Sequence, residues 1–192
     1  CLSKILIWNL SKKSGKPPSR GNCRPIGLTE HLARAFERVL LFRVEAFLGD
    51  HPELICFQYG FTPKRSTFHG AFIRASVMED ANERLRQIYI CFADVAKAYD
   101  SVLDYMLQLA LRRIGMKTSE IRLMLALYQG REMAILSHLG FQTEWFRMMV
   151  GITQGSVLGP TFYKILISIV GVIIMCLVAE HGYLFADRSE ER

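Results

Sequence analysis

The chain has 192 residues, of which 51% are hydrophobic and 22% are charged. This mixture is ordinary for a globular domain with a real core, and it excludes intrinsic disorder, a collagen-like repeat and low-complexity structure. The formal net charge is +6, and the first 26 residues hold six basic side chains and no acidic one. Such a block suits a polyanion such as a nucleic acid, although a solvated basic tail has the same composition.

The N-terminal region is expected to be a loop followed by a helix. Residues 11–25 are rich in Pro, Gly, Ser and Lys, which is typical of an exposed loop. A helix is predicted from Thr29, as its cap, to about Leu48, with Gly49 ending it. Its apolar positions at helical spacing are Leu32, Phe36, Val39, Leu40, Val44 and Phe47.

A second helix and a strand follow a connector over residues 52–63. The helix is predicted to open at Ser66 or Thr67. Its expected apolar face comprises Phe68, Ala71, Phe72, Ala75, Met78 and Leu85. The run IYICF at residues 88–92 is apolar without alternation, which favours a buried central strand.

Glycines punctuate the next elements. One helix is predicted over residues 102–114, ending at Gly115, and another from Thr118 to just before Gly130. Strand-like runs over about 132–138 and 144–150 are joined by a turn that contains Gly140.

A long apolar helix is predicted to begin with Pro160 at its first position and to end at Gly182. Residues 165–179 are apolar except for Ser168, and a run of this length favours a buried helix over a membrane span, which needs about 20 residues. A last strand is expected at residues 183–187. Helices and short strands in this order indicate an α+β fold, with helices packed on a small sheet.

Cysteines and histidines form no metal or disulfide pattern. The five cysteines include no CxxC pair, and the five histidines form no HxxxH or HExxH motif. A zinc site and a disulfide framework are therefore not expected, and a reducing compartment inside the cell is the default. The chain begins with Cys1 and has no signal-peptide pattern, so we expect a fragment with arbitrary ends, located in the nucleus or cytoplasm and not secreted.

Two aspartates stand directly after predicted strands. Asp94 follows IYICF, and Asp187 ends YLFAD. If the strands are neighbours, the two carboxylates meet at one end of the sheet, where they repel unless a divalent cation offsets their charge. Mg²⁺ prefers oxygen ligands of this kind and works with substrate phosphates, as in phosphoryl transfer. The alternative is that each aspartate only caps a helix or turn.

Five segments in a fixed order carry a family resemblance. FADVAKAYD at 92–100 resembles the first catalytic motif of reverse transcriptases, especially those of non-LTR retrotransposons. GITQGSVLGP at 151–160 is similar to their next motif, and YLFAD at 183–187 to the start of their aromatic-Ala-Asp-Asp motif. NCRPI at 22–26 and QYGFTPKRST at 58–67 resemble their two fingers motifs.

The resemblance implies a fold and an activity. The fold is a reverse-transcriptase-like fingers and palm with a small, mostly antiparallel sheet and no thumb. Residues 1–87 are then fingers-like and residues 88–192 are a truncated palm, together one structural unit. The implied activity is RNA-directed DNA polymerase, a nucleotidyltransferase that uses Mg²⁺ or Mn²⁺. Its partners are an RNA template, a DNA primer and deoxynucleoside triphosphates, and no membrane.

The resemblance also assigns roles to single residues. Asp94 and Asp187 would bind the catalytic metals. Tyr99 would stack under the incoming sugar and exclude a 2′-OH, and Gln154 would touch that sugar beside the close backbone of Gly155. Two basic residues that would hold triphosphate or template are Arg24 and Arg65. Taken singly, the two arginines are as typical of surface ion pairs as of phosphate binding. Tyr99 taken alone is more often a core residue, and Gln154 taken alone is more often a turn residue.

One departure opens an alternative function. The second aspartate of the family's pair is replaced by Arg188, a cation beside a site that must collect Mg²⁺. With the thumb also missing, the chain is expected to be weak or inactive as an enzyme. The alternatives are a non-catalytic nucleic-acid-binding remnant and a membrane-inserted peptide around residues 165–179. An acyl hydrolase is disfavoured because Ser156 lies in no GxSxG turn.

Overall fold

The computed structural model describes residues 4–12, 23–55, 58–90, 95–137 and 139–178. The chain divides into two compact units. The first consists of residues 1–50 with 97–163, and the second of residues 51–96 with 164–192.

The first unit contains a four-stranded sheet in the order β2-β1-β3-β4. Its strands are β1 (Lys4–Ser11), β2 (Cys23–Thr29), β3 (Glu132–Leu136) and β4 (Phe146–Arg147). The β1–β2 and β3–β4 pairs are antiparallel and the β1–β3 pair is parallel. Helices accompany this sheet, so the expected α+β fold with a small, mostly antiparallel sheet is confirmed.

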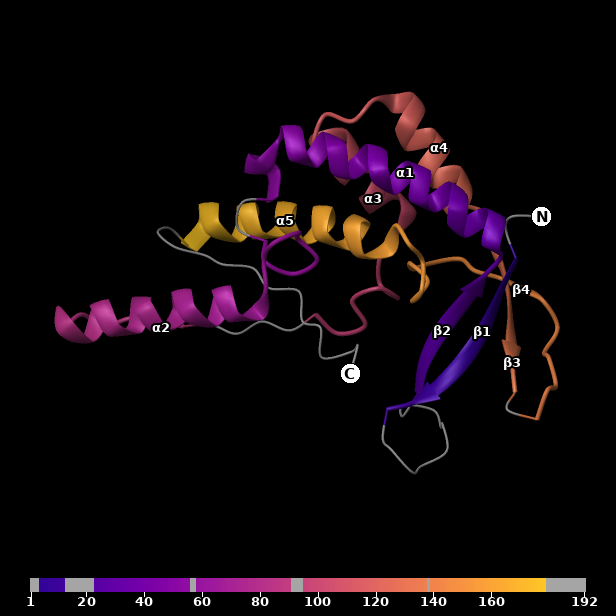
Figure 1. Cartoon of the computed structure of the whole chain (residues 1–192), viewed down its shortest axis with the longest axis horizontal. Coiled ribbons are helices and arrows are strands. Elements are labelled where there is room, and N and C mark those ends of the chain that lie inside the picture. The colour runs from indigo at the N-terminus through magenta and orange to yellow at the C-terminus, as the bar shows by residue number, and fades with distance from the viewer. Residues whose placement is uncertain (1–3, 13–22, 56–57, 91–94, 138, 179–192) are drawn as a thin grey trace. The chain divides into compact units, whose positions relative to one another are not determined.

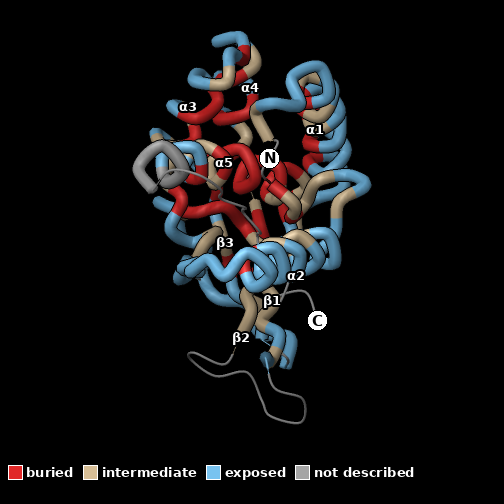
Figure 2. The backbone as a smooth tube through the Cα atoms, turned by 90° about the vertical axis from the view of Figure 1, so that its left-hand side faces the viewer, coloured by how far each residue is buried: buried red, intermediate tan, exposed pale blue. Residues whose placement is uncertain are grey.

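Helices α1 (His31–Asp50), α3 (Asp104–Arg113) and α4 (Thr118–Tyr128) lie at the end of the sheet where β2 leads into α1 (Figure 1). Their inward sides form the core of this unit, drawn in red in Figure 2. From α3 and α4 the core takes Leu107, Ala110, Leu111, Ile121, Met124, Leu125 and Tyr128.

The two predicted helices over 102–128 are confirmed, because local signals bound them. Gly115 follows α3 with a φ of 91°, and Gly130 follows α4 with a φ of 72°. Both values lie in the left-handed region, which glycine adopts at low cost and which ends a helix. The cap of α4 is Lys117, one residue before the expected Thr118.

The predicted loop over 11–25 is wrong at both of its ends. Ser11 closes β1, and residues 23–25 belong to β2, where Cys23 pairs with Ser11 and Pro25 with Asn9. Pro25 is tolerated because β2 is an edge strand, so its missing N–H removes no interior ladder bond. Strands β1 and β2 were not predicted because what stabilises them is their pairing with each other, which local sequence patterns do not reveal.

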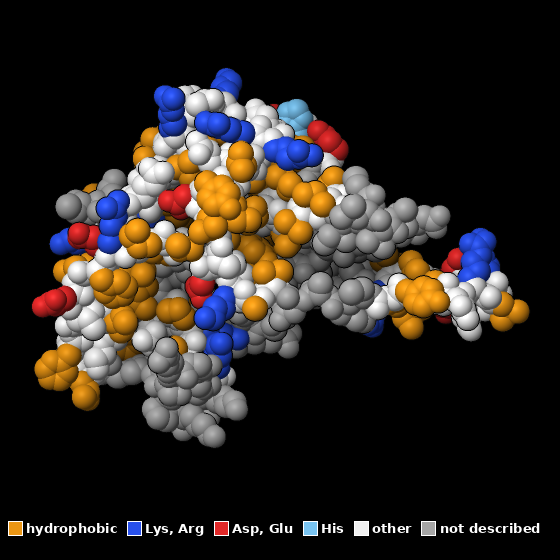
Figure 3. Space-filling model, turned by 180° about the vertical axis from the view of Figure 1, so that it is seen from behind, with side chains coloured by type: hydrophobic (Ala, Val, Ile, Leu, Met, Phe, Trp, Pro, Cys, Tyr) orange, Lys and Arg blue, Asp and Glu red, His pale blue; other side chains and the backbone are white. Residues whose placement is uncertain are grey.

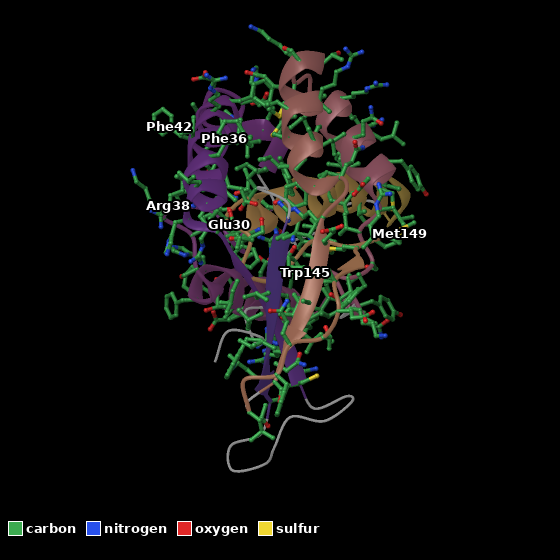
Figure 4. The ribbon with its side chains drawn as sticks, turned by 90° about the vertical axis from the view of Figure 1, so that its right-hand side faces the viewer. Glu30, Phe36, Arg38, Phe42, Trp145 and Met149 are labelled. Carbon is green, nitrogen blue, oxygen red and sulfur yellow. The ribbon has the colours of Figure 1, made fainter. Side chains whose placement is uncertain are left out.

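Helix α1 buries a face that shares only Leu40 and Val44 with the expected one. Its buried residues are Ala33, Glu37, Leu40, Val44 and Leu48. Thr29 is the last residue of β2 and not a helix cap, and Gly49 lies inside the helix. Of the expected face, Leu32 is 75% and Val39 54% exposed. Phe42 points away from the sheet in Figure 4.

The second unit contains the short 3-10 helix η1 (Pro52–Ile55), α2 (Thr67–Glu83) and most of α5 (Gly159–Val178). The cap of α2 is Ser66, as predicted, and its N–H donates to Nδ1 of His69 at 3.1 Å. The expected apolar face of α2 is not buried, since Phe68 is 74% and Phe72 62% exposed. On the side shown in Figure 3, hydrophobic side chains gather in patches, and Lys and Arg lie at a few separate places around them.

The predicted buried strand over 88–92 is not found in its described part. Residues 88–90 form no strand, and Tyr89 is 93% exposed. A run of β-branched and aromatic residues favours a strand only where a partner strand accepts its backbone bonds, and no pairing reaches residues 88–90. Residues 91–94 lie outside the described part of the chain.

The C-terminal predictions are met only in part. Of the run over 144–150, β4 takes two residues, whereas β3 covers most of its predicted run. Helix α5 begins at Gly159, so Pro160 is its second residue. Gly182 and the strand expected at 183–187 lie outside the described residues. Within the described ranges, no helix has both the length and the apolar character that crossing a membrane requires.

Two leucines of α3 test the core. Leu111 is 0% exposed, whereas Leu109 on the same helix is 59% exposed. We expect Leu111→Ala to lower the free energy of unfolding by about 2–5 kcal/mol through lost burial and a residual cavity. Leu109→Ala is the matched control and should change it by less than about 0.5 kcal/mol. Urea unfolding of both variants measures the difference, and equal effects would contradict this core assignment.

Candidate functional site

The turn at Gln154 and Gly155 lies directly against strand β2. The backbone oxygen of Gln154 accepts a hydrogen bond from the N–H of Gly27 at 2.6 Å. Gly155 has a φ of 102°, and a Cβ placed on it would lie 2.7 Å from the carbonyl oxygen of Gly27. Only glycine fits a backbone so turned and so close. Arg24 lies on the same strand, paired with Leu10 of β1.

Tyr99 is tied to the same segment. The N–H of Ile152 donates to the Tyr99 carbonyl oxygen at 2.8 Å, and the N–H of Gly151 donates to that of Val102 at 2.9 Å. The Tyr99 ring stacks on Tyr163 near the start of α5, with centroids 5.3 Å apart and 21° between the planes. The first unit therefore brings Tyr99, the Gln154 turn and the strand of Arg24 together, although they come from three separate motifs.

A buried ion pair lies behind this turn. Glu37 of α1 and Arg131 are 1% and 3% exposed, and Nη2 of Arg131 lies 2.9 Å from Oε1 of Glu37. Nη1 of Arg131 donates to the Thr153 hydroxyl at 3.1 Å. The guanidinium also lies 3.8 Å from the ring centroid of Tyr128, within cation–π range.

The second oxygen of Glu37 is used as well. Oε2 accepts from the N–H of Val157 at 2.7 Å and from the hydroxyl of Ser156 at 3.1 Å. The hydroxyl of Tyr128 hydrogen-bonds with the same Ser156 oxygen at 2.5 Å. Burial, reinforced by the negative charge of Glu37, raises the pKa of the Tyr128 hydroxyl well above its usual value.

Sequence reasoning missed this network. The signal that could have found it is the position of Glu37 on α1. It falls between Ala33 and Leu40 on the stripe that α1 buries, so an acidic residue interrupts an apolar face. A buried carboxylate requires a partner, but the sequence does not say that the partner is Arg131.

Arg65 lies in the second unit and holds a local turn. Its Nη1 donates to the carbonyl oxygens of Ile55 at 3.2 Å and Gln58 at 3.0 Å. Its guanidinium lies 5.2 Å from the ring centroid of Tyr59. These contacts fix the segment that follows η1.

The two predicted metal ligands belong to segments that the structure does not describe. Asp94 and Asp187 both lie outside the described residues, as does Arg188. In the part of the chain that is described, no group of three or more His, Cys, Asp and Glu side chains could hold a metal ion.

Comparison with known proteins identifies one family. The family model described as "Reverse transcriptase (RNA-dependent DNA polymerase)" matches residues 10–187. The chain is 28% identical over 167 residues to the "Probable RNA-directed DNA polymerase from transposon X-element" of Drosophila melanogaster, covering 83% of this chain and 18% of that protein. It is 27% identical over 154 residues to the "RNA-directed DNA polymerase from mobile element jockey" of Drosophila funebris, covering 80% of this chain and 17% of that protein.

The fold has a counterpart among solved structures. The structure described as apo telomerase from Candida tropicalis, truncated from its C-terminal domain, superposes with a TM-score of 0.56 at 14% identity. The match covers 91% of this chain and 40% of that one, and at this identity it supports the fold alone. The chain spans about a fifth of the length of the curated relatives that it matches.

The raised pKa of Tyr128 predicts a pH-dependent stability. Because the folded chain holds the phenol proton more tightly than the unfolded chain, the stabilisation is complete below about pH 10 and falls above it by about 1.4 kcal/mol per pH unit. We expect Tyr128→Phe to cost about 1 kcal/mol near pH 8 through its lost hydrogen bond. The difference in the free energy of unfolding between the wild type and Tyr128→Phe should shrink as the pH rises to about 11. Urea unfolding of both proteins across this pH range measures the difference, and a difference that does not change with pH would count against the raised pKa of Tyr128.

Gly155 tests the contact with β2. Gly155→Ala should lower the free energy of unfolding through both the positive φ and the clash with Gly27, by about 2–4 kcal/mol in all. Gly115→Ala is the matched control, because its φ is 91° and a Cβ there meets nothing within 4 Å. The control should cost only about 1–2 kcal/mol. Equal losses of unfolding free energy in the two variants would show that the contact between Gly155 and Gly27 can relax to admit a side chain.

Proposed function

Because the chain belongs to the reverse transcriptase family, of the type found in non-LTR retrotransposons, we propose that it carries RNA-directed DNA polymerase chemistry. The reaction adds a deoxynucleotide to the 3′-OH of a DNA primer on an RNA template. The observation that supports this most is the joining of Tyr99 to the Gln154 turn through the bond between Ile152 and Tyr99. Two motifs distant in the sequence are thereby joined.

The described residues suit the binding of a nucleotide. Gly155 is exposed to solvent, so a ligand can reach its backbone. Gln154 makes no side-chain hydrogen bond to any described residue, which leaves its amide for a sugar hydroxyl. Tyr99 is half-buried and its ring is backed by Tyr163, which makes it a stiff wall that would exclude a 2′-OH.

The remaining roles concern charge. Asp94 and Asp187 would hold Mg²⁺ or Mn²⁺, since carboxylate oxygens are the ligands these ions prefer. When bound, the metal supplies positive charge opposite the phosphate oxygens of the nucleotide. Arg24 and Arg65 would add guanidinium donors for triphosphate or template. Residues 1–87 would serve as fingers and 88–192 as palm, acting in the nucleus or cytoplasm.

Arg188 favours a second candidate function. Where the family has a second aspartate, this residue adds a positive charge next to Asp187 and weakens metal binding. In that case the chain is a non-catalytic remnant that binds nucleic acid through its basic N-terminal block. Its affinity for RNA or DNA would then fall steeply with salt, and no nucleotide would be added.

Primer extension separates the two functions. With an RNA template, a DNA primer, deoxynucleotides and Mg²⁺, the polymerase function predicts that the wild-type chain extends the primer and that Asp94→Ala loses at least about 100-fold in rate, whereas the remnant extends it in neither form. Asp50→Ala is the matched control, because Asp50 is exposed at the end of α1.

Three outcomes are informative in this experiment. Equal extension by the wild type and Asp94→Ala removes Asp94 from the site. Salt-sensitive binding of the template without extension selects the remnant. The absence of both extension and binding overturns both candidate functions.

A further inference from the structure

Glu37 and Arg131 form a charged pair whose bonds reach α4, through the carbonyl oxygen of Leu127, and one short segment around residue 154. Nearly all of both side chains is shielded from water, and burying two charges is costly even when they are paired. A buried ion pair is therefore weak support for stability as such. The remaining donors and acceptors of the pair show what else it does.

Apart from the bond of Arg131 Nε to Leu127, the remaining bonds lie on both sides of the Gln154–Gly155 turn. On the N-terminal side, Arg131 holds the hydroxyl of Thr153 at 3.1 Å. On the C-terminal side, Glu37 accepts from the N–H of Val157 at 2.7 Å and from the hydroxyl of Ser156. Nη2 of Arg131 and Oε1 of Glu37 lie 2.9 Å apart, so one connected ion pair anchors both ends of the turn.

The turn has a third attachment on its other side. The N–H of Gly27 on β2 donates to the carbonyl oxygen of Gln154, and the backbone of Gly155 lies against the same glycine. The two residues between the charged anchors are therefore fixed through their backbone. The side chain of Gln154, which has no hydrogen-bond partner among the described residues, is left to face a ligand.

We propose that Glu37 and Arg131 are positioning residues that hold the Gln154–Gly155 turn in the geometry that receives the incoming nucleotide. This role rests on the proposed function only for the identity of the ligand. The hydrogen bonds that anchor the turn are present in the chain without a bound ligand. Loss of the pair should loosen the turn and weaken nucleotide binding, while contacts with the template and primer are unaffected.

The test replaces both charges together, because a single replacement leaves the other charge buried and unpaired. Glu37→Met/Arg131→Met preserves apolar volume but removes every bond from the pair to the turn. We expect KM for the deoxynucleotide to rise about tenfold, with KM for the template-primer and the thermal midpoint nearly unchanged. A merely structural role predicts the reverse, namely a lower thermal midpoint and an unchanged KM.

A matched variant separates the effect of the hydrogen bonds from Glu37 to the turn from the effect of the ion pair. Glu37→Gln/Arg131→Met removes both charges but keeps an amide oxygen that can accept from Val157 and Ser156. It should recover most of the lost nucleotide affinity. If it behaves like the double methionine variant, the anchoring bonds of Glu37 are not what holds the turn.

Hydrogen exchange gives a readout that needs no catalysis. In the double methionine variant, amide exchange across residues 151–158 should rise about tenfold, and that of β1 should stay unchanged. Asp80→Asn, which breaks the exposed pair with Arg84, is the control and should alter neither exchange nor KM. Unchanged exchange over 151–158 overturns the proposal whether or not the chain polymerises.

A milder variant covers the case in which the double variant does not fold. Thr153→Val keeps the shape of the side chain that lies against Gly27 and removes only the bond to Arg131. We expect exchange over 151–158 to rise about threefold. If the wild-type chain extends no primer while this exchange pattern holds, the proposed function fails and the positioning role stands.

Discussion

A carboxylate and a guanidinium that have lost nearly all contact with water organise the first unit. Glu37 and Arg131 each need protein partners in place of solvent, and they find them in each other and in the segment from Thr153 to Val157. Because such bonds are short and directional, helix α1, the end of α4 and the Gln154 turn must keep one relative position. The ring of Tyr128 also contacts the guanidinium of Arg131, and the hydroxyl of Ser156 bonds with both Glu37 and Tyr128.

The turn held in this way has features that fit the proposed binding of a nucleotide. Gly155 exposes its backbone, and the neighbouring Tyr99 presents a ring supported by Tyr163. Strand β2 contacts the turn through Gly27 and carries Arg24 on the same strand. The family match over residues 10–187 and this arrangement have different origins, since one compares sequences and the other rests on hydrogen bonds and steric fit. The first shows the family, and the second supports the proposal that the turn binds a nucleotide.

Local signals account for the parts of the fold that were predicted. Helices α3 and α4 were found because apolar spacing and a following glycine are written in adjacent residues. The start of α2 at Ser66 was found for the same reason. Among the site residues, Tyr99, Gln154, Gly155 and Arg24 were chosen by motif resemblance, and the structure brings their segments together. The metal-binding role of Asp94 and Asp187 stays a prediction.

The sequence alone determined the α+β class, the positions of the best-bounded helices and the family, because each depends on neighbouring residues or on an ordered set of motifs. Only the tertiary structure decided that β1 pairs with β2 and β3, which face of α1 is buried, and that Glu37 meets Arg131. Pairing partners and buried faces depend on residues far away in the chain. An exposed acid and a buried one have the same one-letter code, and the difference between them is the environment that the fold supplies.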